Sequence, residues 1–238
     1  LSYYDKSLKK YKLPKIKKFS LKMLKNIDVI FTALPNGGSQ IISKKIDTNK
    51  IILIDLSADF RLKDHLDYKK WYKLKHKSKN LLNESIYALP EIKKQKIKKH
   101  NIIASPGCYP TSILLPLIPL ISNNLIKNNN IIIDSKSGYS GAGRSIHKKF
   151  KNKNLYGSTS AYGIGSHRHN AEIQQELSYI KKSIEFTFTP HILPMFRGIL
   201  STIYLNYKSK ANLNKIYNEL RRFYMNHKFI KILKNKAL

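Results

Sequence analysis

The single cysteine of this 238-residue chain lies in the segment Ala104-Ser105-Pro106-Gly107-Cys108-Tyr109-Pro110-Thr111. A short apolar strand ends there, and we expect a helix to begin at Pro110, because proline is favourable at the first helical position. A thiol at a helix N-terminus faces unpaired backbone N–H groups and the positive end of the helix dipole, which favour the thiolate. Cys108 is therefore our candidate nucleophile. A free cysteine is also commonly a small buried hydrophobe, so position alone leaves both interpretations open.

Two histidines flank an arginine in the segment His167-Arg168-His169, just before a helix for which Asn170 is the expected N-cap. An imidazole carries protons near neutral pH and a guanidinium binds anions, so this segment combines a proton carrier with an anion clamp. Residues two apart in an extended segment point to opposite sides, and we expect only one histidine to face a site. The pair is a weak zinc motif, since one distant cysteine and no nearby acidic ligand accompany it, and we predict no metal. An exposed polar turn is the alternative.

Glycines are confined to segments that we predict as loops at a site. The segment Ser137-Gly138-Tyr139-Ser140-Gly141-Ala142-Gly143-Arg144 resembles a phosphate or dinucleotide loop in composition, but it lacks the Gly-x-Gly-x-x-Gly spacing. Arg197 follows a segment that contains Pro190 and Pro194, and it supplies another cation near a proline-shaped turn.

The first half of the chain has the pattern of a β-α-β unit in a parallel sheet. Residues 28–34 and 51–56 are β-branched apolar runs, typical of strands buried on both faces, and residues 37–46 predict a helix between them. We expect a further helix around Trp71 and a strand at 102–105 that leads to Cys108.

The second half contains longer extended segments, which suggest a second domain. They lie at 131–136, 184–189 and 199–207, and helices are predicted from Asn170 and over 213–225. We place the domains at 1–106 and 107–238. This boundary places Cys108 at the interface between the two domains, where enzyme sites commonly lie.

The chain has 45 basic and 14 acidic residues and a net charge of +31, which usually indicates nucleic acid or an anionic membrane. Only six of the basic residues are arginines, and the lysines gather in runs with asparagine and isoleucine. Lysine, asparagine and isoleucine all have A/T-rich codons, so we attribute the excess of positive charge to genome composition. We therefore predict no nucleic-acid or membrane partner. The longest apolar stretch, 113–121, is too short to cross a bilayer, and a lone cysteine favours the cytoplasm.

Several motifs together resemble those of the N-acetyl-gamma-glutamyl-phosphate reductase family, in that family's order and approximate spacing. They are Pro106-Gly107-Cys108-Tyr109-Pro110-Thr111, Ser140-Gly141-Ala142-Gly143-Arg144, His167-Arg168-His169 with Glu172-Ile173, Phe188-Thr189-Pro190-His191 and Arg197-Gly198-Ile199, with Asp55-Leu56-Ser57-Ala58-Asp59-Phe60-Arg61 in the first half. The resemblance implies an α/β fold with a partial Rossmann-like parallel sheet domain and a glyceraldehyde-3-phosphate-dehydrogenase-like α+β catalytic domain. We also expect a homo-oligomer.

The resemblance implies a mechanism as well. Cys108 would attack the carbonyl of an acyl phosphate, phosphate would leave, and the thioester would accept a hydride from NADPH to give a semialdehyde. His169 would act as the acid/base, with His167 as the less favoured candidate. The residues that we assign to the substrate's carboxylate and phosphate are Arg168, Arg144 and Arg197. Those that we assign to the NADP cofactor are Gly138, Ser140, Gly141 and Pro35.

The sequence departs from the family at two places. Ala171 stands where the family usually has proline, and we expect little effect from it. The chain also opens at Leu1 without the strand and glycine-rich turn that grip the cofactor pyrophosphate, and it stops before the segment that completes the first domain. We expect it to be a central portion of the enzyme that by itself binds NADPH poorly.

Three other functions fit parts of the pattern. A relative acting on the aminoadipyl substrate of lysine synthesis differs by one methylene, which these residues do not reveal. A basic nucleic-acid-binding protein would bind DNA in a salt-sensitive manner without needing Cys108. A thiol hydrolase would release the acyl group to water. Only the reductase would consume NADPH when an acyl phosphate is added.

Overall fold

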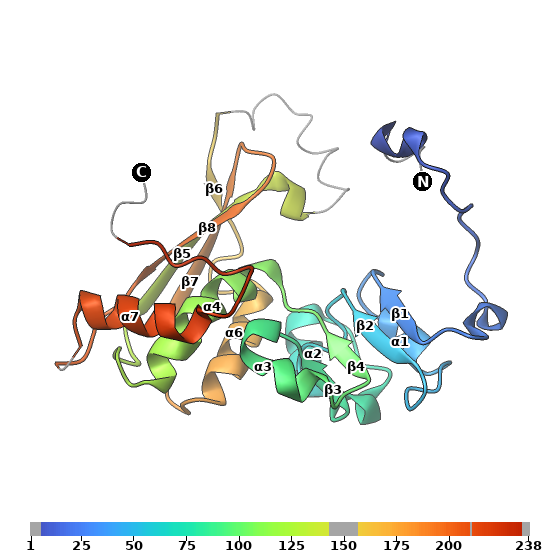
Figure 1. Ribbon diagram of the computed structural model, residues 1–238, viewed down its shortest axis with the longest axis horizontal. Helices are drawn as coiled ribbons and strands as arrows, with labels where there is room; N and C mark the ends of the chain where they lie inside the picture. The colour runs from blue at the N-terminus through green and yellow to red at the C-terminus, as the bar shows by residue number, and fades with distance from the viewer. Residues whose placement is uncertain (1–5, 143–156, 210, 235–238) are drawn as a thin grey trace.

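The computed structural model describes residues 6–142, 157–209 and 211–234, and these form two four-stranded sheets joined through residues 105–107 (Figure 1). The predicted Arg144 lies outside the described residues. Short 3-10 turns occur at Lys6–Lys10, Leu21–Leu24, Lys79–Leu82 and Tyr139–Ala142. We propose the boundary between the 1–106 and 107–238 domains at the junction of the two sheets.

The first sheet is wholly parallel, with strand order β1-β2-β4-β3. Its strands are β1 (Val29–Thr32), β2 (Ile52–Asp55), β3 (Ser85–Tyr87) and β4 (Ile102–Ala104), and its helices are α1 (Gly38–Ser43), α2 (His65–Tyr72) and α3 (Pro90–Ile97). The predicted β-α-β unit and the helix around Trp71 are confirmed. We did not predict β3, because its three residues are all buried and show no alternation.

The second sheet is mixed, with strand order β6-β7-β5-β8. Its strands are β5 (Ile131–Gly138), β6 (Ser160–Ala161), β7 (Phe186–Leu193) and β8 (Ile199–Tyr204), and its helices are α4 (Cys108–Ser122), α6 (His169–Ser178) and α7 (Leu213–Tyr224). Strand β5 pairs in parallel with β7 and antiparallel with β8. Helix α4 packs on β8, α6 and α7, and Figure 1 shows the three helices on the same side of the sheet.

Helix α4 forms the centre of the largest hydrophobic core. Its residues Ile113, Leu114 and Leu117 are fully buried and belong to one cluster with Ile131 and Ile133 of β5. A separate cluster joins the two halves of the chain, since it contains Ala171 of α6 together with Ala58, Leu62, Tyr68 and Tyr72. The described residues include no helix long and apolar enough to cross a membrane.

Helix α4 begins at Cys108, two residues before the predicted start at Pro110. Gly107 is the N-cap with an extended backbone (φ −66°, ψ 155°). Pro110 is then the third helical residue, which is tolerated because the N–H groups of a first turn have no helical partner to lose. Pro116 and Pro119 lie inside the helix without ending it.

Asp59 fixes the loop that follows β2. Its carboxylate accepts hydrogen bonds from the backbone N–H of Gly37 (2.7 Å), from that of Ser39 (2.9 Å) and from the hydroxyl of Tyr68 (2.6 Å). Gly37 and Ser39 flank the start of α1, so the helix N-terminus is already satisfied by a carboxylate of the chain itself.

Candidate active site

Cys108 is an exposed free thiol at the first position of α4. The backbone N–H groups of Cys108 and Tyr109 both lower the pKa of its thiol. Pro110 has no N–H, and the N–H of Thr111 already bonds to the carbonyl of Gly107 at 3.0 Å. The first turn of the helix therefore directs its two remaining donors at the sulfur atom.

Opposing effects act on the pKa of the Cys108 thiol. Desolvation is the largest effect on the thiol and raises its pKa, and the Glu172 carboxylate raises it as well. The N–H groups of Cys108 and Tyr109 and the charge of Arg61 lower the pKa, but the net shift is upward. The helix start thus acts in the predicted direction, and burial outweighs it.

His167 and His169 both contact the ring of Tyr109, the residue that follows Cys108. The centroid distances are 5.5 Å and 5.8 Å, and the two imidazoles lie 4.7 Å from each other. The segment is not extended, because α6 begins at His169, so the alternation on which we based the expectation of one site-facing histidine does not apply. Asn170 does not cap the helix as predicted; its side-chain amide donates to the carbonyl of His167 at 3.1 Å.

The imidazole of His169 also packs on Gly107, the residue that precedes Cys108. A Cβ added at position 107 would lie 2.6 Å from His169 Nε2, so glycine is required for this close approach. His167 Nδ1 accepts the backbone N–H of His169 at 3.2 Å, which leaves the proton of the neutral ring on Nε2. Together the two rings cover the residues on both sides of Cys108.

Both histidines make the stability of the fold sensitive to acid. Burial and the charge of Arg168 lower the pKa of His167 to about 4, and burial together with His167 and Arg61 lowers the pKa of His169 well below its usual value. Below about pH 6.5 the unfolded chain binds protons that the folded chain does not, so the free energy of unfolding falls as the pH drops. For His167 we expect denaturation in urea to show a free energy of unfolding about 1–2 kcal/mol lower at about pH 5 than at about pH 7.5, and His169 to add to this loss.

The variant His167→Gln is the control for this pH dependence. It removes one titrating group, so its stability should change less between the two pH values than that of the unmodified chain. An equal loss of stability in both proteins would show that His167 does not titrate as described.

The two predicted substrate-binding arginines with described positions pack on different aromatic rings. The guanidinium of Arg168 lies 5.9 Å from the ring centroid of Tyr72, and that of Arg197 lies 5.1 Å from the ring centroid of Phe196. Both side chains are exposed and open to an anionic ligand. Arg144 has no described position.

The predicted cofactor residues of the second half form a compact turn with Arg197. A Cβ at Gly138 would lie 2.8 Å from the backbone nitrogen of Arg197, and the N–H of Ser140 donates to the carbonyl of Phe196 at 2.9 Å. Gly141 lies beside Ser137, whose hydroxyl would be 3.4 Å from an added Cβ. The need for glycine at position 138 is thus explained by contact between two backbone segments.

Pro35, the remaining predicted cofactor residue, follows β1 at the carboxyl edge of the first sheet. Its carbonyl accepts the N–H of Gly38 at 2.9 Å, which closes the turn into α1. Pro35 itself is exposed.

Sequence reasoning missed two charged residues at the site, Glu172 and Arg61. Their side chains form a buried ion pair with 3.1 Å between Arg61 Nη1 and Glu172 Oε1. Two sequence signals pointed to them. Glu172 is three residues after His169 and therefore on the same helical face, and Arg61 is one of few arginines in a lysine-rich chain.

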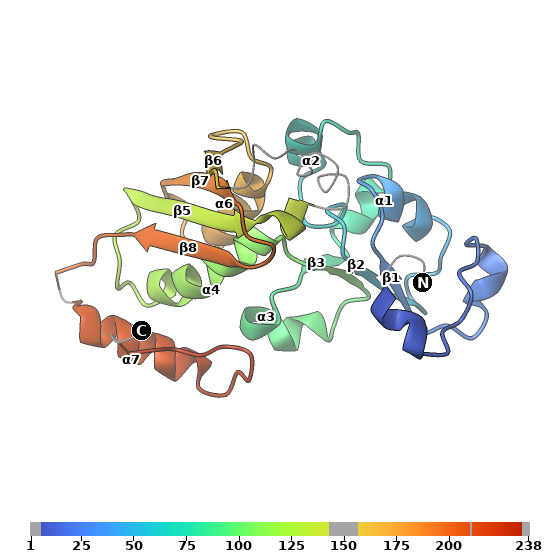
Figure 2. The ribbon, with the colours of Figure 1, turned by 90° about the horizontal axis from the view of Figure 1, so that it is seen from above.

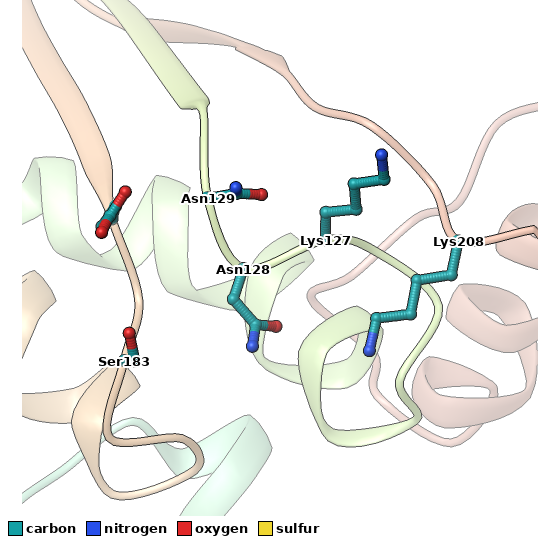
Figure 3. A pocket seen from close by; sticks show the side chains of 6 residues that line it. Lys127, Asn128, Asn129, Ser183 and Lys208 are labelled. Carbon is teal, nitrogen blue, oxygen red and sulfur yellow. The ribbon is translucent and has the colours of Figure 1, made fainter.

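A surface pocket elsewhere in the molecule carries no comparable chemistry. It lies beyond the far end of α4, and its lining residues are Lys127, Asn128, Asn129, Ser183, Glu185 and Lys208 (Figure 3). The side chains are mostly exposed and carry mixed charge. Within the described part of the chain, no three His, Cys, Asp or Glu side chains are placed to hold a metal ion.

Two family models match the chain. The semialdehyde dehydrogenase NAD-binding domain matches residues 1–100, and the semialdehyde dehydrogenase dimerisation domain matches residues 108–238. The chain therefore belongs to the semialdehyde dehydrogenase family.

Within this family, its relatives are N-acetyl-gamma-glutamyl-phosphate reductases, which confirms the resemblance drawn from the motifs. The reductase of Clostridium botulinum (strain Eklund 17B / Type B) is 49% identical over 216 residues, covering 89% of this chain and 62% of the relative. That of Ehrlichia ruminantium (strain Gardel) is 44% identical over 239 residues, covering 100% of this chain and 69% of the relative. The chain thus spans less than two thirds of the length of the first of these two relatives.

Solved structures of aspartate semialdehyde dehydrogenases share the fold. The enzyme from Francisella tularensis has a TM-score of 0.62 at 14% identity, covering 86% of this chain and 65% of that chain. The enzyme from Candida albicans, solved with NADP, has a TM-score of 0.54 at 13% identity, covering 82% of this chain and 55% of that chain. These comparisons confirm the predicted combination of a Rossmann-like parallel sheet with a second, mixed-sheet domain.

Proposed function

We propose that this chain carries the nucleophile and the proton-transfer residues of an NADPH-dependent N-acetyl-gamma-glutamyl-phosphate reductase of arginine synthesis. The observation that supports this function best is the placement of Cys108. The residue begins α4, two backbone N–H groups lower the pKa of its thiol, and the glycine before it packs on an imidazole. The cytoplasm remains the location that we propose.

In the first step, Cys108 Sγ loses its proton and attacks the carbonyl carbon of the acyl phosphate. The carbon–oxygen bond to phosphate then breaks, phosphate leaves with the electron pair, and a thioester remains on Cys108. The N–H groups of Cys108 and Tyr109 are placed to stabilise the oxyanion. We propose that a neighbouring group takes the thiol proton.

His169 is our candidate for that proton transfer, and His167 is the second candidate. Both rings are neutral at pH 7, since burial lowers the pKa of each. A neutral imidazole can accept the thiol proton and later return a proton to the product. Arg168, Arg144 and Arg197 remain our proposals for binding the carboxylate and the phosphate of the substrate.

The carboxyl edge of the first sheet fits a nicotinamide cofactor, whereas the N-terminus of α1 does not offer a site for its phosphates. The carboxyl ends of the parallel strands β1, β2 and β4 are where α/β sheets bind ligands, and β4 leads directly to Cys108. Pro35, Gly138, Ser140 and Gly141 are the residues that we propose for contact with NADP. The N-terminus of α1 is excluded as a phosphate site, since Asp59 already occupies its donors. When bound, the cofactor supplies the hydride that reduces the thioester.

The test is a stopped assay with NADPH and N-acetyl-gamma-glutamyl phosphate. A decrease in NADPH absorbance that requires the acyl phosphate, with release of phosphate and the semialdehyde, would support the reductase. The aminoadipyl acyl phosphate, tested in parallel, determines the substrate length. Release of phosphate without NADPH consumption, together with free carboxylic acid as the product, would instead identify a thiol hydrolase.

We also propose that a second copy of the chain covers the outer face of the second sheet. The family model for this half describes a dimerisation domain. On this face Ile132, Leu200 and Tyr204 are 50%, 63% and 56% exposed, and in Figure 2 no described α-helix crosses in front of β5 and β8. Apolar side chains exposed together on one sheet face are typical of an interface between subunits.

The variant Leu200→Glu should weaken this self-association. A buried, unpaired carboxylate is unfavourable at an interface, so we expect the dissociation constant to rise about tenfold or more. Sedimentation equilibrium measures the effect. Leu213→Glu is the control, because Leu213 is 54% exposed on α7, away from this face, and its substitution should leave the association unchanged.

A further inference from the structure

A buried ion pair connects the two domains directly behind Cys108. Arg61 comes from the loop after β2 and is 8% exposed, whereas Glu172 comes from the first turn of α6 and is fully buried. A buried ion pair adds little net stability over apolar side chains of similar volume. Stability alone therefore does not explain its presence at this position.

The pair holds both ends of the peptide that precedes the nucleophile. Arg61 Nε donates to the carbonyl of Ser105 at 2.7 Å, and Glu172 Oε2 accepts the backbone N–H of Gly107 at 2.9 Å. The same Oε2 accepts the hydroxyl of Tyr87 at 2.9 Å, and Oε1 accepts that of Tyr72 at 3.4 Å. The carboxylate of Glu172 is thus fixed by contacts from four segments of the chain: the loop after β2, α2, β3 and the residue before α4.

Glu172 also lies beside the proposed acid/base. Its Oε1 is 3.7 Å from His169 Nε2, and the same edge of that imidazole packs on Gly107. One carboxylate therefore contacts the residue before the thiol and faces the ring proposed to take the thiol proton.

We propose that Glu172 and Arg61 are positioning residues, which place Cys108 and His169 relative to each other and balance the charge at the thiol. This inference rests on the proposed role of Cys108 as nucleophile. Neither residue contacts the substrate in the proposed reaction; each acts through the backbone of residues 105–107 or through His169.

The two members of the pair act on the thiol in opposite directions. The positive charge of Arg61 lowers the pKa of Cys108, and the negative charge of Glu172 raises it. Removal of one charge leaves the effect of the other uncompensated. A residue that only stabilised the fold would not produce shifts of opposite sign.

The experiment measures the rate of alkylation of Cys108 by iodoacetamide as a function of pH, on the full chain. Only the thiolate reacts, so the midpoint of the profile reports the thiol pKa. We expect Glu172→Gln to move the midpoint down and Arg61→Gln to move it up, each by about half a pH unit or more. In the double variant, which lacks both charges, the midpoint should return toward that of the unmodified chain. This variant can still be measured if one single variant fails to fold.

Glu176→Gln is the matched control. Glu176 lies on the same helix, is also buried, and pairs across the domain junction with Lys93 of α3, without contacting Gly107. Its substitution should lower stability without moving the alkylation midpoint. Shifts of the same sign in both single variants, or a shift in Glu176→Gln equal to that in Glu172→Gln, would overturn the proposal.

Alkylation requires no substrate, so the two proposals fail separately. If the two variants shift the alkylation midpoint in opposite directions but the chain never becomes acylated, the reductase function would be refuted. The effect of the ion pair on the thiol would still stand. If the chain becomes acylated but the variants show no shifts of the alkylation midpoint, the reductase function would be supported and the effect of the ion pair on the thiol would be refuted.

Discussion

Replacement of Cys108 by alanine should abolish acylation of the chain by N-acetyl-gamma-glutamyl phosphate. In the proposed mechanism the acyl group is transferred to Sγ, and Cys108 is the only cysteine of the chain. Loss of a nucleophile typically slows an enzyme by about four orders of magnitude or more, because no other group can form the covalent intermediate. Mass spectrometry of the intact chain, mixed with the acyl phosphate and without reductant, measures the added acyl group directly.

The fold should survive this substitution, because the Cys108 side chain is exposed and occupies no core position. The melting temperatures of Cys108→Ala and of the unmodified chain should therefore agree. An acyl group found on the variant, or never found on the unmodified chain, would contradict the proposed role of the thiol.

Replacement of Glu172 by alanine should produce a large loss of stability. The substitution leaves Arg61 buried without a counter-charge, and removal of one partner of a buried ion pair costs about 3–5 kcal/mol. It also removes the acceptor of the Gly107 N–H and the Tyr87 hydroxyl, both of which are buried. Urea denaturation at constant pH measures the change in the free energy of unfolding.

The contrasting variant is Lys50→Ala. Lys50 forms an ion pair with Asp47 at 3.6 Å, but both side chains are largely exposed, so its removal should change stability by less than about 1 kcal/mol. If Glu172→Ala lost no more stability than Lys50→Ala, Glu172 would not be the buried partner of Arg61.

The sequence predicted the elements whose causes are local. The runs at 28–34 and 51–56 became β1 and β2, and the segment before Cys108 became a strand that leads into a helix. Apolar runs, turn residues and short spacings act over a few neighbouring residues, so they can be read without knowledge of distant contacts. The motif order carried enough information to predict the family.

Other features became visible only in the tertiary structure. Arg61 and Glu172 are 111 positions apart, and nothing in the pattern of a chain with 45 cations shows which one pairs with which carboxylate. The pKa of the Cys108 thiol likewise depends on the charges of Arg61 and Glu172, which are both distant from it in sequence.

The sequence by itself thus determined the nucleophile candidate, the histidine segment beside a helix start and the parallel β-α-β unit. Only the tertiary structure decided that both imidazoles meet at Tyr109, that α4 begins at Cys108, and that a carboxylate from α6 holds the peptide before the thiol. The physical reason is that secondary structure follows from local backbone preferences, whereas burial, charge pairing and proton affinity depend on which distant groups the folded chain brings together.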